Sequence, residues 1–443
     1  MAALHAFLFR PVSIAPLLTF RILLGGLLSV GALRFLVSGW IETLYVEPVF
    51  FFHFYGFDWV QPFSEAGMYA LYGLIALSGL GVALGAFYRL SSVLLFLSFT
   101  YAELVDAANY LNHYYLVCLL LFGLLFVPAH RAFSVDARRR PARTIATVPA
   151  WCIHIFMLQL TLVYFFAGFA KLDADWLLRA MPMAVWLPER TDLPVLGYFF
   201  QFGWVAYAFS WAGALYDLTI GFLLWHRRAR PWAYVAVVVF HVLTRILFNI
   251  GLFPYIMILG TLVFFSGAWH ERLLGYLGYR PSGGTWARGR NRWITWAVGG
   301  YFLIQLLLPL RFLAYPGQLL WTEQGYRFAW RVMLVEKSGQ ITFTVEDRAT
   351  GRRTEIVNGD YLTRFQEKQL AIQPDFILQF AHHLADEYRT RHGFSQPAVY
   401  ADAYVSLNGR RARRLIDPDV DLAARTDGWQ HKDWLLIHPN TNE

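Results

Sequence analysis

The chain has 443 residues, of which 57% are hydrophobic and only 15% charged, and its mean hydropathy is +0.40. Soluble domains are usually about 45–50% apolar and about 25% charged, so this composition excludes an ordinary soluble protein and predicts a polytopic membrane protein. The net charge of +8 comes from basic residues in short loops between apolar runs, which is typical of cytoplasmic loops and requires no nucleic acid partner. The two cysteines lie inside apolar runs and imply neither a disulfide framework nor a metal site.

Nine apolar segments are candidate membrane-spanning helices, which need about 20 mainly apolar residues each. The first segment contains Arg21 and lacks a clear small-residue cleavage site, so we expect a retained span rather than a signal peptide. The fold class is therefore predicted to be mainly α. The nine segments cover residues 12–38, 64–87, 90–106, 113–129, 150–170, 198–225, 231–248, 252–268 and 293–312.

The charges of the loops orient these spans. With the N-terminus in the cytoplasm, the arginine-rich stretches 131–143, 226–230 and 271–292 all face the cytoplasm. The opposite loops, 39–63 and 107–112, carry no lysine or arginine. This orientation places the C-terminal part of the chain, together with the ends of spans three and five, on the extracytoplasmic side.

A small extracytoplasmic α+β domain is predicted for residues 315–443, after a membrane domain of residues 1–314. Residues 331–357 alternate apolar and polar side chains, which predicts a β-hairpin. Residues 373–393 carry apolar side chains at helical spacing, and two further strands are expected around Asn408–Gly409. The turn signals of the hairpin stand at residues 337–339 and 349–351.

Lys171 is the only lysine in the first 336 residues, and it ends a long apolar run in the sequence AGFAKLDADW. Elsewhere in the apolar part arginine carries the positive charge; arginine stays protonated, whereas a desolvated lysine can lose its proton. Such a lysine is typical either of chemistry that needs a neutral amine or of a side chain that snorkels at the membrane edge. Asp173 and Asp175 favour the ammonium form, and Asp175, four residues on, offers an ordinary ion pair.

Other polar groups are expected near the same membrane face as Lys171. Ionisable groups inside a membrane are costly and usually functional. His113 begins the fourth span, where a histidine either donates a hydrogen bond to a developing oxyanion or bonds to a backbone carbonyl. No GxSxG, P-loop, GxGxxG or HExxH pattern is present, which argues against a protease or a nucleotide-driven mechanism, and we predict no metal centre. The further groups expected at this face are Asp106, Asn112, Asp173 and Asp175.

The segment VYFFAGFAKLDADW resembles the catalytic-lysine segment of the vitamin K-dependent γ-glutamyl carboxylases, and LNHYYL (111–116) resembles a second segment of that family. The resemblance covers nearly the whole chain and suggests a compact bacterial relative with a horizontally transferred transmembrane (HTTM) domain. Further segments that resemble the family in the same order are 84–96, 133–140, 215–224, 240–255, 321–334 and 404–421.

The resemblance implies a reaction in two coupled steps. Lys171 would deprotonate vitamin K hydroquinone, or menaquinol in a bacterium, with His113 assisting at the oxyanion. In the family, the quinol anion reacts with O₂ and passes toward the epoxide through a strong base. That base removes a γ-proton from a peptide glutamate, and the carbanion captures CO₂. The expected partners are therefore a glutamate-containing peptide and the lipid bilayer, in the bacterial inner membrane.

The remaining site residues are assigned in three groups. Contacts to the reduced naphthoquinone are assigned to Asn112, Asp106, Arg21 and His241. Supporting positions around the lysine are assigned to Asp173, Asp175 and Asp217. The aromatic segment near the family's glutamate site corresponds to Tyr326, Phe328 and Trp330, together with Arg327.

The chain departs from the animal proteins in ways that keep other functions open. The animal proteins have two adjacent lysines where this chain has Ala170 and Lys171, and they continue into a further external β domain, without which recognition of a substrate propeptide is not expected here. Gly325 and Arg327 alter the motif near the glutamate site. One alternative is therefore a quinol epoxidase that does not carboxylate glutamate. Another is a transporter or membrane scaffold on the same fold.

Overall fold

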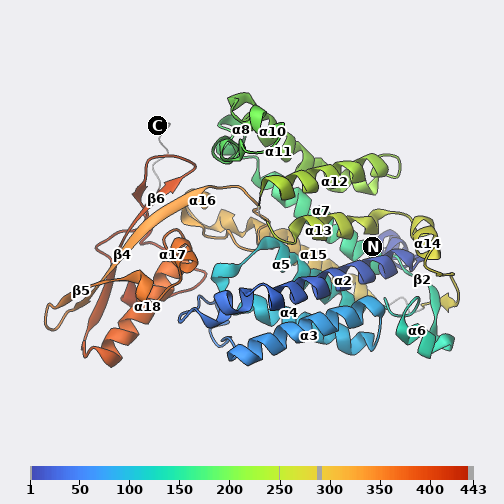
Figure 1. Cartoon of the computed structure of the whole chain (residues 1–443), viewed down its shortest axis with the longest axis horizontal. Coiled ribbons are helices and arrows are strands. Elements are labelled where there is room, and N and C mark those ends of the chain that lie inside the picture. The colour runs from blue at the N-terminus through green and yellow to red at the C-terminus, as the bar shows by residue number, and fades with distance from the viewer. Residues whose placement is uncertain (1, 249, 287–291, 438–443) are drawn as a thin grey trace.

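The structure is a computed structural model that describes residues 2–248, 250–286 and 292–437. A bundle of long helices forms one part of the molecule, and a smaller part with an antiparallel sheet lies at one end of it (Figure 1). The longer helices are α2 (Ala15–Val37), α3 (Glu65–Leu84), α4 (Tyr88–Leu104), α5 (Asn112–Phe126), α7 (Trp151–Ala170), α11 (Gly203–Trp225), α12 (Arg230–Leu247), α13 (Phe253–Gly260), α14 (Gly267–Gly275) and α15 (Arg292–Leu307). The short ones are α1 (Ala2–Phe9), α6 (Val135–Arg139), α8 (Ala174–Leu178), α9 (Met183–Trp186), α10 (Leu196–Phe200) and α16 (Leu319–Thr322).

The protein is a multi-pass membrane protein. Within the described residues, six helices are long and apolar enough to cross a membrane, and a seventh span results if the bent pair Phe253–Phe264 and Gly267–Gly275 is one unit. Each of the nine predicted segments coincides with helical structure, but α4 has 17 residues and α5 has 15, which is short for a span. The predicted span 252–268 is not one straight helix, because the pair bends by 113°.

Glycines allow the membrane helices to approach closely, as is common where small residues line helix contacts. A Cβ atom on Gly25 of α2 would lie 2.7 Å from the carbonyl oxygen of Gly79 in α3. A Cβ atom on Gly168 of α7 would lie 2.5 Å from the backbone nitrogen of Leu218 in α11. The second contact sets how closely the C-terminal end of α7 approaches the middle of α11.

The C-terminal part contains a four-stranded antiparallel sheet in the order β5-β4-β6-β7. The predicted hairpin is confirmed as the β4–β5 pair, but residues 337–339 open β4 rather than forming a turn. The predicted helix is confirmed as α18, and the last two strands meet at Asn408 and Gly409, both with positive φ. The elements are β4 (Lys337–Asp347), β5 (Arg353–Ile356), β6 (Pro397–Leu407), β7 (Arg413–Arg414), α17 (Arg364–Leu370) and α18 (Pro374–Arg391).

The two parts share side chains. Phe52 precedes α3 in the chain, yet it is fully buried in the C-terminal core, and its ring stacks on that of Phe376 with 4.3 Å between centroids. At the other end of the bundle, a small sheet that the sequence pattern did not predict joins β1 (Pro11–Ser13), β2 (Ile145–Pro149) and β3 (Gly284–Thr285). Both ends of the helix bundle are therefore tied by contacts between distant segments.

We predict that Gly168→Ala destabilises the protein, because the added methyl group meets backbone atoms of α11 that cannot turn aside. Overpacking of this kind costs about 1–3 kcal/mol, and thermal unfolding of the detergent-solubilised protein should register it as a lower Tm. Gly26→Ala is the matched control, since nothing lies within 4 Å of its Cβ position. Equal Tm values for the two variants would contradict the close contact of α7 and α11.

Candidate functional site

Lys171 follows the last residue of α7 and forms a buried ion pair with Asp217 of α11. The distance from Nζ to Oδ2 is 2.7 Å, and the two residues are only 5% and 6% exposed. Nζ also donates to the carbonyl oxygen of Ala167 at 3.3 Å, and it lies 5.1 Å from the ring centroid of Trp176. The side chain of Lys171 therefore points back along α7, and its amine lies next to the ring of Trp176 and the carboxylate of Asp217.

The neighbouring carboxylates of the KLDADW segment point elsewhere, so the ion pair between Lys171 and Asp175 that sequence spacing allowed does not form. Asp173 accepts a hydrogen bond from the backbone of Asp175 at 2.9 Å and caps α8. Asp175 accepts hydrogen bonds from Asn408 at 2.9 Å and from both terminal nitrogens of Arg410. Burial alone would raise the pKa of Asp175, but these hydrogen bonds outweigh it and hold that pKa below its usual value.

A cavity of about 490 Å³ opens beside the ion pair. This volume lies within the range of about 300–1,000 Å³ that is usual for ligand pockets. Its walls come mainly from α7, α11, α12 and α13 and are largely apolar. Besides Lys171 and Asp217, the titratable residues in the wall are Tyr164, Tyr216 and His241.

A second polar point lies in the same cavity. The hydroxyl of Tyr164 and Nε2 of His241 are 3.0 Å apart, and Nδ1 of His241 has no hydrogen-bond partner among the described residues. A buried polar atom without a partner is uncommon and marks a place where a ligand can bind. Of the four residues predicted to contact a naphthoquinone, His241 is the one that lines this cavity.

The other three residues predicted to contact the naphthoquinone lie outside the cavity wall. Arg21 donates to the carbonyl oxygen of Phe133 at 2.8 Å, in the arginine-rich stretch 131–143. Asp106 binds the backbone of Phe52 and Ala108 and the side chain of Gln366, which joins the two parts of the molecule. Neither Arg21 nor Asp106 is placed to touch a ligand beside Lys171. The third residue, Asn112, is hydrogen-bonded to the backbone of Arg331 next to the cavity.

His113 is buried behind the cavity wall. Phe253 lines the cavity, and its ring centroid lies 5.8 Å from that of His113 and 5.3 Å from that of His241. Nε2 of His113 has no hydrogen-bond partner among the described residues. One aromatic ring therefore separates His113 from the space that Lys171 faces.

Residues 325–333, which we name the strap, lie between this cavity and a second one. Val332 and Met333 line the first cavity, whereas Gly325, Arg327 and Phe328 line the second. Phe328, Trp330 and Met333 have φ values of 60°, 57° and 53°, a strained region for residues other than glycine.

Several contacts hold the strap in this conformation. The side-chain amide of Asn112 donates to the carbonyl oxygen of Arg331 at 3.0 Å, and the hydroxyl of Tyr326 lies 3.4 Å from the same oxygen. Trp330 is buried and stacks on Tyr115 with 4.9 Å between ring centroids. The sequence prediction placed Asn112 at the cofactor and Tyr326 and Trp330 at the substrate; in the structure all three fix the strap.

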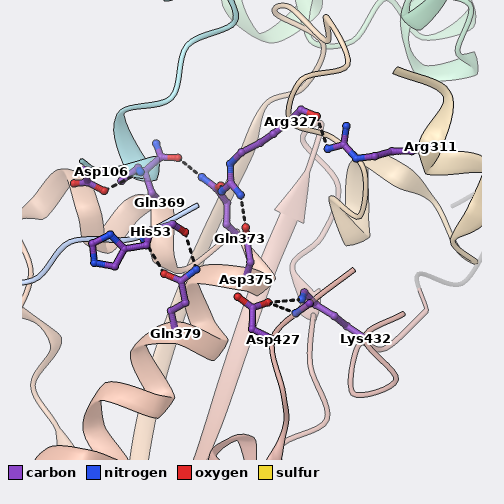
Figure 2. A network of polar contacts seen from close by, with 12 residues as sticks. His53, Asp106, Arg311, Arg327, Gln369, Gln373, Asp375, Gln379, Asp427 and Lys432 are labelled. Carbon is purple, nitrogen blue, oxygen red and sulfur yellow. Dashed lines mark hydrogen bonds and ion pairs between the residues drawn. The ribbon is translucent and has the colours of Figure 1, made fainter. Parts of the chain in front are cut away.

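The second cavity has a volume of about 270 Å³ and lies where the helix bundle meets the C-terminal part. Figure 2 shows the network of polar residues in and around it: the side chain of Arg327 is directed at Gln373 and Asp375, and Arg311 donates to the backbone oxygen of Arg327. Burial would raise the pKa of Asp375, but the guanidinium of Arg327 outweighs it and lowers that pKa. Arg311 forms no ion pair with a carboxylate among the described residues.

Three site residues make contacts in the structure that the sequence did not predict for them. Asp217 was predicted only as a supporting group, although it is the direct partner of Lys171. Tyr164 was not predicted, although its position seven residues before Lys171 places both side chains on one helix face and could have indicated it. Arg410 lies more than 200 residues from Asp175 in the chain, so no local sequence pattern predicts their contact.

Comparison with known families gives two matches. A model of the HTTM domain matches residues 9–269, which is more than half of the chain. A model of the vitamin K-dependent gamma-carboxylase lumenal domain matches residues 290–441. The two matches follow each other along the chain with little between them. No solved structure matches the chain.

We predict that the contact between Asp175 and Arg410 couples the Lys171 segment to the C-terminal part. Asp175→Ala and Arg410→Ala should each lower the free energy of unfolding by about 2–3 kcal/mol, because each removes the nearest charged partner of a buried or half-buried charge, and the double variant should cost little more than either. After Arg410→Ala, Asp175 keeps the hydrogen bond from Asn408 and the more distant Arg179, at 3.8 Å. Thermal unfolding in detergent measures all three. The folded pKa of Asp175 is lowered, so this stabilisation is present at neutral pH and is lost as the pH falls below about 4.

Arg414→Ala is the matched control, since the ion pair of Arg414 with Asp402 is exposed and should contribute no more than about 1 kcal/mol. Strictly additive effects of the Asp175 and Arg410 substitutions would show that the two side chains stabilise the fold independently.

Proposed function

The chain belongs to the vitamin K-dependent γ-carboxylase family, and from this premise we propose that it oxygenates a reduced naphthoquinone and carboxylates peptide glutamate. The observation that carries the proposal is the buried amine of Lys171 at the wall of an apolar cavity. We further propose nine spans in the bacterial inner membrane with a cytoplasmic N-terminus, a membrane domain of residues 1–314 and an extracytoplasmic domain of residues 315–443.

The residues of the cavity suit a two-ring quinol, vitamin K hydroquinone or menaquinol. Apolar walls formed by membrane helices accept a lipophilic molecule from the bilayer and exclude water. The polar points at Lys171 and at the Tyr164–His241 pair offer partners for two ring hydroxyls. When bound and reacting with O₂, the quinol supplies a base strong enough to remove a glutamate γ-proton, for which no side chain suffices at pH 7.

The proposed role of Lys171 is to take the hydroxyl proton of the quinol on Nζ. Lysine suits this role because its amine can be neutral before the transfer and cationic after it, whereas arginine stays protonated. Trp176 and Ala167 hold Nζ at the cavity wall. His113 would assist at the oxyanion, as in the family, if the ring of Phe253 turns aside.

The second cavity is the proposed entry for a glutamate-containing peptide. It lies at the junction with the C-terminal part, which the proposed topology puts outside the cytoplasm. Arg327 is already paired with Asp375, so Arg311 is the better candidate to bind the glutamate carboxylate, by charge-assisted hydrogen bonds. Phe328 of the strap lies in the same wall.

A second candidate function is epoxidation without carboxylation. It is favoured by the strap, which stands between the two cavities and leaves them separate. Incorporation of labelled CO₂ into a short glutamate peptide distinguishes the two functions, because epoxidation alone leaves the peptide unlabelled.

We predict that Lys171→Arg abolishes oxygenation of vitamin K hydroquinone, because arginine can keep the ion pair with Asp217 but cannot become neutral. The purified protein is supplied with the hydroquinone and O₂, and epoxide is measured by chromatography. Lys368→Arg, the same substitution at an exposed lysine of α17, is the matched control. Epoxide formation near the wild-type rate in Lys171→Arg would exclude the lysine as the base.

We predict that Arg311→Gln weakens use of a glutamate peptide in the carboxylation assay. Loss of charge-assisted hydrogen bonds worth about 1.5–3 kcal/mol should raise the peptide concentration at half-maximal rate roughly tenfold or more. Arg389→Gln, an exposed arginine of α18, should behave like the wild type. An unchanged concentration dependence in Arg311→Gln would place the peptide carboxylate elsewhere.

A further inference from the structure

The ion pair at the site poses a chemical difficulty for a basic lysine. Nζ of Lys171 is 2.7 Å from Oδ2 of Asp217, and a carboxylate at this distance stabilises the ammonium form. An ammonium group cannot accept a proton. If Lys171 is the base of the proposed function, its own proton must first leave, and the buried site offers little water to receive it.

Asp217 is an unusual carboxylate for a buried ion pair. Among the described residues it receives a hydrogen bond only from Lys171. Buried ion pairs recover their desolvation cost only when further hydrogen bonds satisfy the remaining lone pairs. Asp175 illustrates the difference, because Arg410 and Asn408 both donate to it.

The other titratable groups near the pair are tyrosine or histidine side chains, or they make contacts of their own. Tyr164 and Tyr216 on α7 and α11 and His241 on α12 line the same cavity. On the side of the strap, Asp173 caps α8, and the guanidinium of Arg331 lies over the ring of Phe312. No second cation is hydrogen-bonded to Asp217 among the described residues, so nothing but Lys171 holds it ionised.

We propose that Asp217 is the internal proton acceptor of Lys171, so that the pair converts from ammonium and carboxylate to amine and carboxylic acid when an apolar ring fills the cavity. This inference rests on the proposed function of Lys171 as a base. Filling the cavity removes the remaining water, which penalises two charges more than two neutral groups. Asp217 acts through Lys171 and is therefore a positioning residue for the proton.

The proton balance of this step is simple. The proton on Nζ of Lys171 moves to Oδ2 of Asp217, and the net charge of the pair stays zero. The neutral amine then takes the hydroxyl proton of the quinol, which leaves an ammonium, a carboxylic acid and a quinol anion. The single negative charge on the ring is matched by the single positive charge on Lys171.

Infrared spectroscopy of the whole protein in detergent tests the proton position without any turnover. Wild-type protein carrying ¹³C-labelled aspartate is compared with and without menadione, an oxidised naphthoquinone that fills the cavity but donates no hydroxyl proton. We expect menadione to produce the C=O band of a protonated carboxylic acid. Asp217→Asn should lack this band, whereas Asp386→Asn, an exposed aspartate of α18, should keep it. A wild-type spectrum that retains only carboxylate bands with menadione bound overturns the proposal.

The pH dependence of epoxidation gives the second readout. A pair that moves its proton internally should give a rate that changes little with pH, whereas an amine that must release its proton to water gives a rate rising about tenfold per unit below its pKa. We expect a flat profile for the wild type and for Asp217→Glu, and a rising profile for Asp217→Asn. A rising wild-type profile overturns the proposal. If no epoxide forms at all, the proposed function fails, while the infrared band still decides the role of Asp217.

Discussion

The contact between α7 and α11 is the constraint on which the site depends. Gly168 leaves no room for a side chain between the two helices, so the end of α7 lies against Asp217. A charged pair buried among apolar side chains is costly and stable only in good geometry. The glycine contact provides that geometry, and the resulting ion pair lies in the wall of the apolar cavity.

The C-terminal part stabilises the site from the other side. Arg410 and Asn408, at the turn between β6 and β7, bind Asp175, which lies four residues after Lys171. Phe52 fills the C-terminal core from a loop of the membrane part. Reactive groups must be held within a fraction of an ångström to be effective, and supporting contacts provide this accuracy. The two matched family segments are therefore in direct contact beside Lys171.

Sequence patterns predicted the elements better than their contacts. Hydropathy located the helices of 15 or more residues in the membrane part, and alternation located the C-terminal strands, because both patterns are local. Lys171 was identified because it is alone among arginines. Its partner Asp217 was not, because the sequence spacing offered Asp175 instead. That i+4 relation holds only on a continuing helix, and α7 ends at Ala170. Arg21 was assigned to the naphthoquinone although the predicted orientation already placed it in the first half of a span that begins in the cytoplasm, and in the structure it bonds to Phe133 instead.

The strap lies between the two cavities and separates them. Residues other than glycine with positive φ cost about 1–3 kcal/mol each, so the conformation at Phe328, Trp330 and Met333 persists only because other contacts enforce it. The stacking of Trp330 on Tyr115 and the hydrogen bond from Asn112 do so. In the proposed function, a base formed in the apolar cavity can meet a peptide in the polar one only past this segment. On that proposal, the contacts that strain the strap also set the barrier between oxygenation and carboxylation.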